Sequence, residues 1–209
     1  MVLGNLSSQM GQRSEQGNRK VAALILENPE FLLEIKDGLF QQNASLLGDC
    51  AEVCTLVAEQ NPQLVALLAE NLLPLLRHKN TRVRWESMHA LAFVTPFVSE
   101  LIQESIPLLE TLFRNDKSTI VRDYAILTAG NLAAVGTTQA KAVYPLLNLA
   151  LTLHETKFAK LGLDGLSKSV KYLPHKHNEL MEIAELFLQH GRPSIQQAAK
   201  KLKKALQEL

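Results

Sequence analysis

The stretch DKSTIVRDYAILTAGNLAA, residues 116–134, decides the fold that this sequence predicts. It reads as a short loop followed by a helix with apolar residues at steps of four, four and three: Val121, Ala125, Ala129 and Leu132. This spacing places the four side chains on one face of the helix. Because alanine and glycine are small, a neighbouring helix can lie close to that face. The same kind of segment occurs four more times, so the sequence predicts a repeat architecture.

The repeat becomes visible when the branched or small residue that opens each second helix is aligned. These anchors stand 36, 38, 38 and 36 residues apart: Leu47, Val83, Val121, Ala159 and Ile195. The next core position follows each anchor after one helical turn: Ala51, Ser87, Ala125, Leu163 and Ala199. One helix pair of this kind cannot cover its own apolar face, so the pairs are expected to stack on one another.

The composition favours packed helices and gives no strong overall field. The chain has 209 residues, 46% of them hydrophobic and only 5% aromatic, with alanine and leucine dominant. The formal net charge is +1, which argues against a global attraction to nucleic acid or membrane. The charge is uneven, however: residues 21–70 hold eight acids and one base, and residues 157–209 hold ten lysines or arginines and five acids.

The chain is expected to form one domain behind a short tail. Residues 1–12, MVLGNLSSQMGQ, show no sustained period and predict a flexible N-terminal tail. Residues 13–209 are predicted to form a single repeat domain. No apolar run reaches the roughly 18 residues that span a bilayer, and residues 1–20 lack the apolar region of a signal peptide. We therefore expect a cytoplasmic protein with no membrane partner.

The pattern around residue 121 resembles the HEAT repeat, and these residues carry the resemblance: Pro107, Asp116, Val121, Arg122, Ala125 and Ala129. The segment HKNTRVRWESMHAL around Val83 resembles it too, without the aspartate in its loop. The resemblance implies an all-α fold, a right-handed α-α superhelix (α-solenoid) of about five HEAT-like helix pairs, whose second helices line a concave surface. HEAT-like solenoids serve as scaffolds, transport receptors, lyases and DNA-repair enzymes, so the resemblance predicts fold rather than partner.

Three cations stand one residue after their anchors, at equivalent positions of successive repeats: Arg84, Arg122 and Lys160. One interpretation is a structural ladder, in which each cation bonds loop carbonyls or an acid such as Asp116. The other is a basic stripe that meets an acidic partner.

The side chains of the second helices that lie off the core face form the predicted partner-binding set: Trp85, Glu86, His89, Phe93, Asp123, Tyr124, Leu127 and Asn131. Aromatic and apolar groups beside charges suit a protein contact, with Trp85 and Tyr124 as its anchors. Alternatively, these two rings fill gaps between adjacent second helices. In the following repeat, Gly162 and Gly165 either leave a notch or allow close packing against another helix.

No motif for catalysis or cofactor binding is visible: there is no Gly-rich phosphate loop, no Gly-x-Ser-x-Gly and no His-Glu-x-x-His. Cys50 and Cys54 lack further ligands nearby, and two loop histidines are too few for a metal site. We therefore expect no metal and no cofactor. A lysine cluster near the C-terminus reads as a solvated capping face or as a contact for phosphate or an acidic surface: Lys200, Lys201, Lys203 and Lys204.

The sequence thus favours a non-enzymatic protein-protein interaction module or scaffold that binds another protein or peptide on its concave second-helix face. The alternative is a nucleic-acid-binding HEAT-like protein similar to DNA glycosylases, in which Asp123 would act beside Trp85 and Tyr124 on an extruded base. The low net charge, the acidic N-terminal third and the scarcity of aromatics argue against it. A lyase for a small ligand is a third option that no residue pattern marks.

Overall fold

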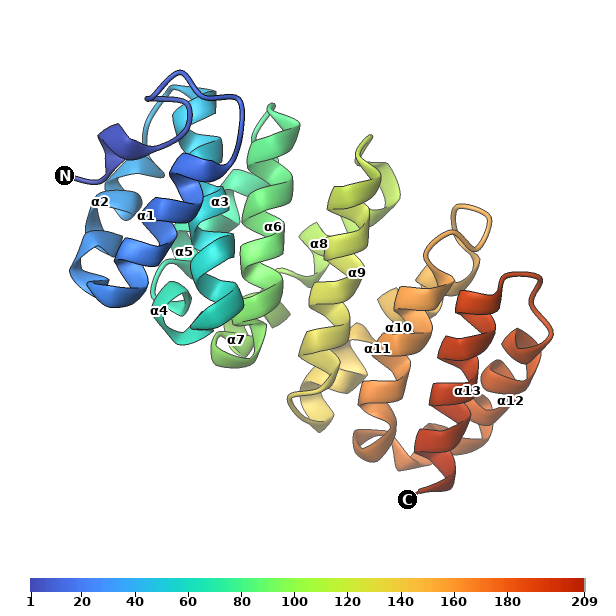
Figure 1. Cartoon of the computed structure of the whole chain (residues 1–209). Helices are drawn as coiled ribbons and strands as arrows, with labels where there is room; N and C mark the ends of the chain where they lie inside the picture. Colours follow the sequence, from blue (N-terminus) through green and yellow to red (C-terminus); the bar gives the residue numbers. More distant parts are fainter. Residues whose placement is uncertain (209) are drawn as a thin grey trace. The chain divides into compact units, whose positions relative to one another are not determined.

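The computed structural model describes residues 1–208, and no residue in this range lies in a β-strand. The chain divides into two compact helical units, Met1–Val98 and Ser99–Leu209 (Figure 1). Each unit is built from helical hairpins whose second helices pack against one another. Along residues 1–208, no helix combines the length and the apolar character that a membrane crossing requires.

The first unit (blue to green in Figure 1) is a stack centred on one long helix. Its elements are η1 (Leu3–Asn5), α1 (Gln16–Glu27), η2 (Pro29–Phe31), α2 (Leu32–Gly38), α3 (Ala44–Gln60), α4 (Pro62–Ala66), α5 (Ala69–Leu72), η3 (Leu73–Arg77), α6 (Thr81–Val94) and η4 (Thr95–Phe97). Helix α3 packs against both α1 and α6, so these helices share one apolar core.

The sequence predicts a helix from Pro62 to about Arg77 that Pro74 kinks or splits. The structure divides this segment twice, first between α4, which ends at Ala66, and α5, which begins at Ala69. Helix α5 ends at Leu72, and the chain continues as the 3₁₀ helix η3. The cause is local, because proline lacks the amide hydrogen and its ring clashes with the preceding turn.

The second unit (green to red) repeats the same arrangement. Its elements are α7 (Ser99–Glu104), α8 (Ile106–Asn115), α9 (Thr119–Ala133), α10 (Thr137–Thr152), α11 (Ala159–Ser169), η5 (Val170–Tyr172), η6 (Pro174–Lys176), α12 (His177–Leu188) and α13 (Pro193–Gln207). The second helices α9, α11 and α13 pack in sequence, α11 against both of the others. Helices α8, α10 and α12 support them from behind: α8 contacts α9, α10 contacts both α9 and α11, and α12 contacts α13.

The core lies where the repeat pattern predicts it. All five anchors and all five core positions that follow them are at most 3% exposed. Burial of this apolar surface contributes roughly 25 cal/mol per Å² removed from water. The register of each second helix therefore follows directly from the sequence.

Close approach of helices explains the glycines of α11. A Cβ atom on Gly165 would lie 3.0 Å from the Cα of Gly130 on α9, and one on Gly162 would lie 2.9 Å from the carbonyl oxygen of Leu147 on α10. Both glycines are buried. Of the two sequence-based interpretations, the structure supports close packing rather than a notch.

The segment predicted as a flexible tail is packed in this structure. Val2 and Leu6 are 3% and 0% exposed. The amide of Ser7 donates to Asn18 Oδ1 at 2.9 Å, and the amide of Ser8 donates to Asp49 Oδ2 at 2.7 Å. Two apolar side chains and two backbone hydrogen bonds thus hold a stretch whose average composition is polar.

Candidate binding surfaces

Helix α6 presents the aromatic part of the predicted site in the first unit. Asn80 caps this helix, because its Oδ1 accepts from the amides of Arg82 at 2.9 Å and Val83 at 3.3 Å. This start fixes the register that places Trp85, His89 and Phe93 four residues apart on one stripe. All three rings are half-buried, and those of His89 and Phe93 stack with centroids 5.0 Å apart. The stripe contains three of the predicted partner-binding residues.

Glu86 lies off this stripe and is 9% exposed. Its Oε1 accepts a hydrogen bond of 2.6 Å from Nε1 of Trp85. Burial raises the pKa of Glu86 to about 6, with the Glu52 carboxylate adding to the rise while the bond from Trp85 opposes it. Burial also lowers the pKa of His89, against the pull of Glu59. The carboxyl group of Glu86 therefore holds the indole of Trp85 in place.

A charged network that the sequence did not reveal joins α3 to α6. Nη2 of Arg82 lies 2.7 Å from Asp49 Oδ1 and 2.6 Å from Glu52 Oε2. Asn18 on α1 donates to the same two carboxylates. Burial alone would raise the pKa of Asp49, but hydrogen bonds from Ser8, Asn18 and Arg82 outweigh it and hold the pKa below its usual value. No repeat pattern marks this pair, because Asp49 follows its anchor Leu47 by two residues whereas Arg82 precedes its anchor Val83 by one.

In the second unit, a groove of about 500 Å³ runs between α9 and α11. Its lining residues are Ile120, Asp123, Tyr124 and Leu127 from α9, Lys157 from the preceding loop, and Lys160 and Leu161 from α11. The groove thus brings together three residues of the predicted set. Burial raises the pKa of Asp123, while the nearby Lys157 acts in the opposite direction.

Asn131, the fourth predicted residue of α9, is not among the residues that line this groove. Its Oδ1 accepts a hydrogen bond of 2.7 Å from Nζ of Lys168 on α11. Asn131 therefore ties two second helices together, and Lys168 is held at their junction.

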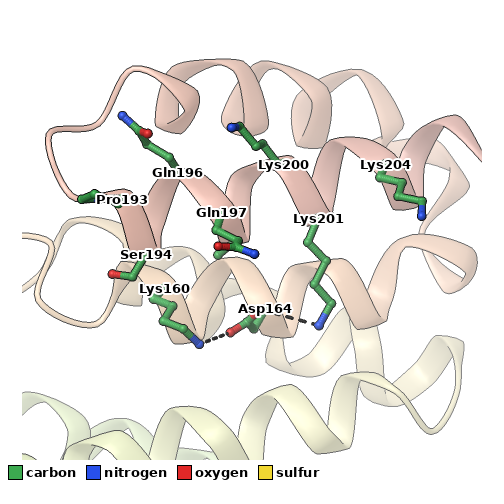
Figure 2. A pocket seen from close by; sticks show the side chains of 10 residues that line it. Lys160, Asp164, Pro193, Ser194, Gln196, Gln197, Lys200, Lys201 and Lys204 are labelled. Carbon is green, nitrogen blue, oxygen red and sulfur yellow. Dashed lines mark hydrogen bonds and ion pairs between the residues drawn. The ribbon is translucent and has the colours of Figure 1, made fainter.

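A larger groove of about 810 Å³ lies on α11 and α13 (Figure 2). Residues lining it include Lys160, Asp164, Gln197, Lys200, Lys201 and Lys204. Asp164 Oδ2 is 2.7 Å from Nζ of Lys160, and Asp164 Oδ1 is 3.7 Å from Nζ of Lys201. Gln197 and Lys201 point from α13 toward α11, whereas Lys200 projects from the opposite side of its helix. Because Lys160 lines both grooves, they form one continuous surface.

The three cations at equivalent repeat positions make different contacts. Arg84 Nη1 donates to the carbonyls of His78 and Lys79, and Arg122 Nε donates to the carbonyl of Asp116 at 2.6 Å. Arg122 Nη1 also contacts His154 Nδ1 at 3.2 Å. Both arginines therefore bond carbonyls of their own preceding loop, and Lys160 instead pairs with Asp164 on its own helix.

The cysteines are free, buried thiols. Burial raises the pKa of Cys50 to about 12 and raises that of Cys54 as well, so neither is a thiolate at neutral pH. Across residues 1–208, no three His, Cys, Asp or Glu side chains cluster in a way that could hold a metal ion.

Comparison with known proteins places the fold. No family model matches the sequence, and no curated protein matches it either. Several solved structures do match the fold of this chain. An engineered protein superposes with a TM-score of 0.74 at 15% identity, over 99% of this chain and 95% of its own. A designed armadillo repeat protein in complex with the peptide (KR)4 gives 0.72 at 16% identity, over 98% of both chains. This chain has the HEAT/armadillo repeat fold.

A natural protein of this fold also matches. The HEAT-like repeats protein of the archaeon Thermococcus onnurineus NA1 superposes with a TM-score of 0.58 at 14% identity, over 92% of this chain and 93% of its own. Identities this low establish the fold alone. The predicted all-α solenoid of HEAT-like helix pairs is thereby confirmed.

Proposed function

We propose that this HEAT/armadillo repeat protein is a non-enzymatic interaction module that binds a peptide segment of another protein on its second helices. The observation that carries the proposal is the groove on α9 and α11, where Asp123, Tyr124 and Leu127 face Lys157 and Lys160. A designed armadillo protein of similar fold holds a peptide, (KR)4. A cytoplasmic location and a single repeat domain over residues 13–209 belong to the same proposal.

The chemistry of this groove suits a peptide. Tyr124, Leu127 and the 40%-exposed Ile120 offer apolar area that a partner can cover. Protein interfaces draw most of their affinity from a few such groups inside a polar rim. The flanking lysines and Asp123 supply that rim and can fix the register of the bound segment.

The stripe of Trp85, His89 and Phe93 on α6 offers a second contact in the first unit. Its rings are half-buried and the indole is held by Glu86, so little side-chain entropy is lost when a partner covers them. Aromatic anchors of this kind are typical of the energetic centre of an interface.

Selection from a random peptide library on the immobilised full chain tests the proposal. We expect enriched peptides to bind in fluorescence anisotropy, and Tyr124→Ala and Leu127→Ala each to weaken binding about tenfold, or about 1.4 kcal/mol. Leu186→Ala is the matched control, because Leu186 is an exposed leucine on the first helix α12. Circular dichroism melts establish that each variant folds. An absence of enriched binders, or equal affinity of all variants, would refute the proposed function.

A further inference from the structure

We infer that the continuous surface of α9, α11 and α13 binds an acidic peptide, with the α11–α13 groove as the seat of its carboxylates. This inference rests on the proposed function and specifies the chemical class of the partner. Three features of the surface support it: its charge, the pairing of its lysines and the shape of its lining.

The surface concentrates positive charge in a chain that is nearly neutral. Six lysines line its cavities: Lys157, Lys160, Lys168, Lys200, Lys201 and Lys204. Three carboxylates accompany them: Asp123 and Asp164 in the lining, and Glu208, which lies 3.5 Å from Lys204. Lys200 projects from the opposite side of α13, so five lysines and three carboxylates lie on this face, which leaves an excess of two positive charges against +1 for the whole sequence.

The lysines at the centre of the surface share one carboxylate. Asp164 pairs with Lys160 at 2.7 Å and with Lys201 at 3.7 Å. Lys168 lies in the same region, and its pKa is lowered by burial and by Lys201, with Asp164 acting in the opposite direction. Three ammonium groups near one carboxylate leave a local excess of positive charge, which creates a demand for a negatively charged ligand. An incoming carboxylate would meet that demand at a site where Lys160 and Lys201 are more than half exposed.

The shape of the lining favours an extended peptide. Packed helices lie 8–10 Å apart, which corresponds to roughly three residues of an extended chain. Acidic side chains about three residues apart would therefore meet Lys160 on α11 and Lys201 on α13 in turn. Gln197 points toward α11 in Figure 2 and offers an amide for the peptide backbone.

The same lining fits nucleic acid less well. Tyr124 is the one aromatic residue in the lining of these grooves as described, so bases would find little to stack on. Asp123 and Asp164 stand along the path that a phosphate backbone would follow. The lining cations are lysines, which lack the bidentate geometry with which arginine grips phosphate.

Fluorescence anisotropy with the full chain tests the inference. The probes are labelled nine-residue peptides with three copies of Glu-Glu-Leu, Gln-Gln-Leu or Lys-Lys-Leu, and a 20-nucleotide single-stranded DNA. We expect the glutamate peptide to bind at least about tenfold more tightly than the glutamine peptide, with affinity falling as salt screens the charges. The lysine peptide is expected to bind most weakly of the three.

Two double variants locate the binding. Lys160→Gln with Lys201→Gln should weaken the glutamate peptide at least tenfold and leave the glutamine peptide unchanged. Lys20→Gln with Lys141→Gln removes the same charge from exposed positions on α1 and α10, outside the lining of these grooves, and should have little effect. Since all four lysines are exposed, these variants are expected to fold.

Each contrary result has a distinct meaning. Equal affinity for the glutamate and glutamine peptides, or equal weakening by both double variants, overturns this inference. Tighter binding of the DNA than of the glutamate peptide overturns it in favour of nucleic acid. If library-selected neutral or basic peptides bind through Tyr124 and Leu127, the proposed function stands and the acidic class falls. If no peptide of any charge binds, both fall.

Discussion

Charged side chains are paired differently at two contacts between second helices. Between α3 and α6, Arg82 bonds Asp49 at 2.7 Å and Glu52 at 2.6 Å, and Asp49 is 1% exposed. Between α11 and α13, the more exposed Asp164 is shared by Lys160 and Lys201, which both lie open to water. The same helix packing thus supports a satisfied internal network in one unit and an under-paired cationic surface in the other. Satisfied charges hold the fold, and unsatisfied ones are available to a partner.

The largest effect is expected from breaking the satisfied network. Asp49→Ala removes the acceptor for Ser8, Asn18 and Arg82 and leaves their donors without it. Removing one partner of a buried charged pair costs about 3 kcal/mol, reduced here to about 2 kcal/mol because Arg82 is partly exposed. Urea unfolding of the variant measures this cost. A loss below about 0.5 kcal/mol would show that the network is not structural.

A smaller effect is expected where two second helices touch. Gly165→Ala places a Cβ 3.0 Å from the Cα of Gly130 and 2.6 Å from Cδ2 of Leu147. The leucine end can turn away, but the backbone of α9 cannot, so we expect a loss of about 1–2 kcal/mol. Thermal melts compare it with Gly191→Ala, where no atom lies within 4 Å of the new Cβ. A stabilised Gly165→Ala variant would contradict the close packing of α9 and α11.

The hydrogen bond from Trp85 to Glu86 should make the fluorescence of Trp85 depend on pH. The pKa of Glu86 is raised to about 6, so the folded state holds its proton more tightly than the unfolded chain does. Protonated Glu86 therefore adds to the free energy of unfolding. That contribution is fully present below the unfolded pKa near 4.5 and is lost as the pH rises through about 6. Trp85 is the single tryptophan of the sequence, so its fluorescence reports the bonded carboxyl.

We expect the emission of folded protein to change with a midpoint near pH 6, which is the value set by the buried carboxyl. Glu86→Gln should abolish that transition, and the control Glu59→Gln, on an exposed residue of α3, should retain it. A midpoint near the ordinary glutamate pKa would show that Glu86 is solvated and that Trp85 is not braced.

The smallest effect is expected from the under-paired surface. Asp164→Asn removes exposed ion pairs to Lys160 and Lys201, each of which contributes little. Stability in urea should change by less than about 0.5 kcal/mol. Affinity for an acidic peptide should rise, because a competing carboxylate is gone. A loss of stability comparable to that of Asp49→Ala would erase the contrast between the two pairs of helices.

The sequence predicted what periodicity controls. The anchors Val83 and Val121 and their core followers are buried because a helix repeats its faces every 3.6 residues, which the sequence displays directly. The same register located Tyr124 and Leu127 on the groove. Pro74 ended its helix for a purely local reason.

What the sequence did not predict depends on contacts between distant residues. The bonds among Asn18, Asp49 and Arg82 join three helices, and nothing local to any of them announces the network. The polar composition of residues 1–12 predicted a flexible tail, although two apolar side chains, Val2 and Leu6, are enough to dock so short a segment. Glu86 adjoins Trp85 in sequence, but its hydrogen bond to the indole depends on its burial against α3, which the sequence does not display.

The most direct test of the central claim is a nuclear magnetic resonance titration of the isotope-labelled full chain with the glutamate peptide. Amide shifts report which residues a bound segment covers. We expect perturbations concentrated on α9, α11 and α13, centred on Lys160, Asp164 and Lys201. Perturbations confined to the first helices α8, α10 and α12, or none at saturating peptide, would contradict it.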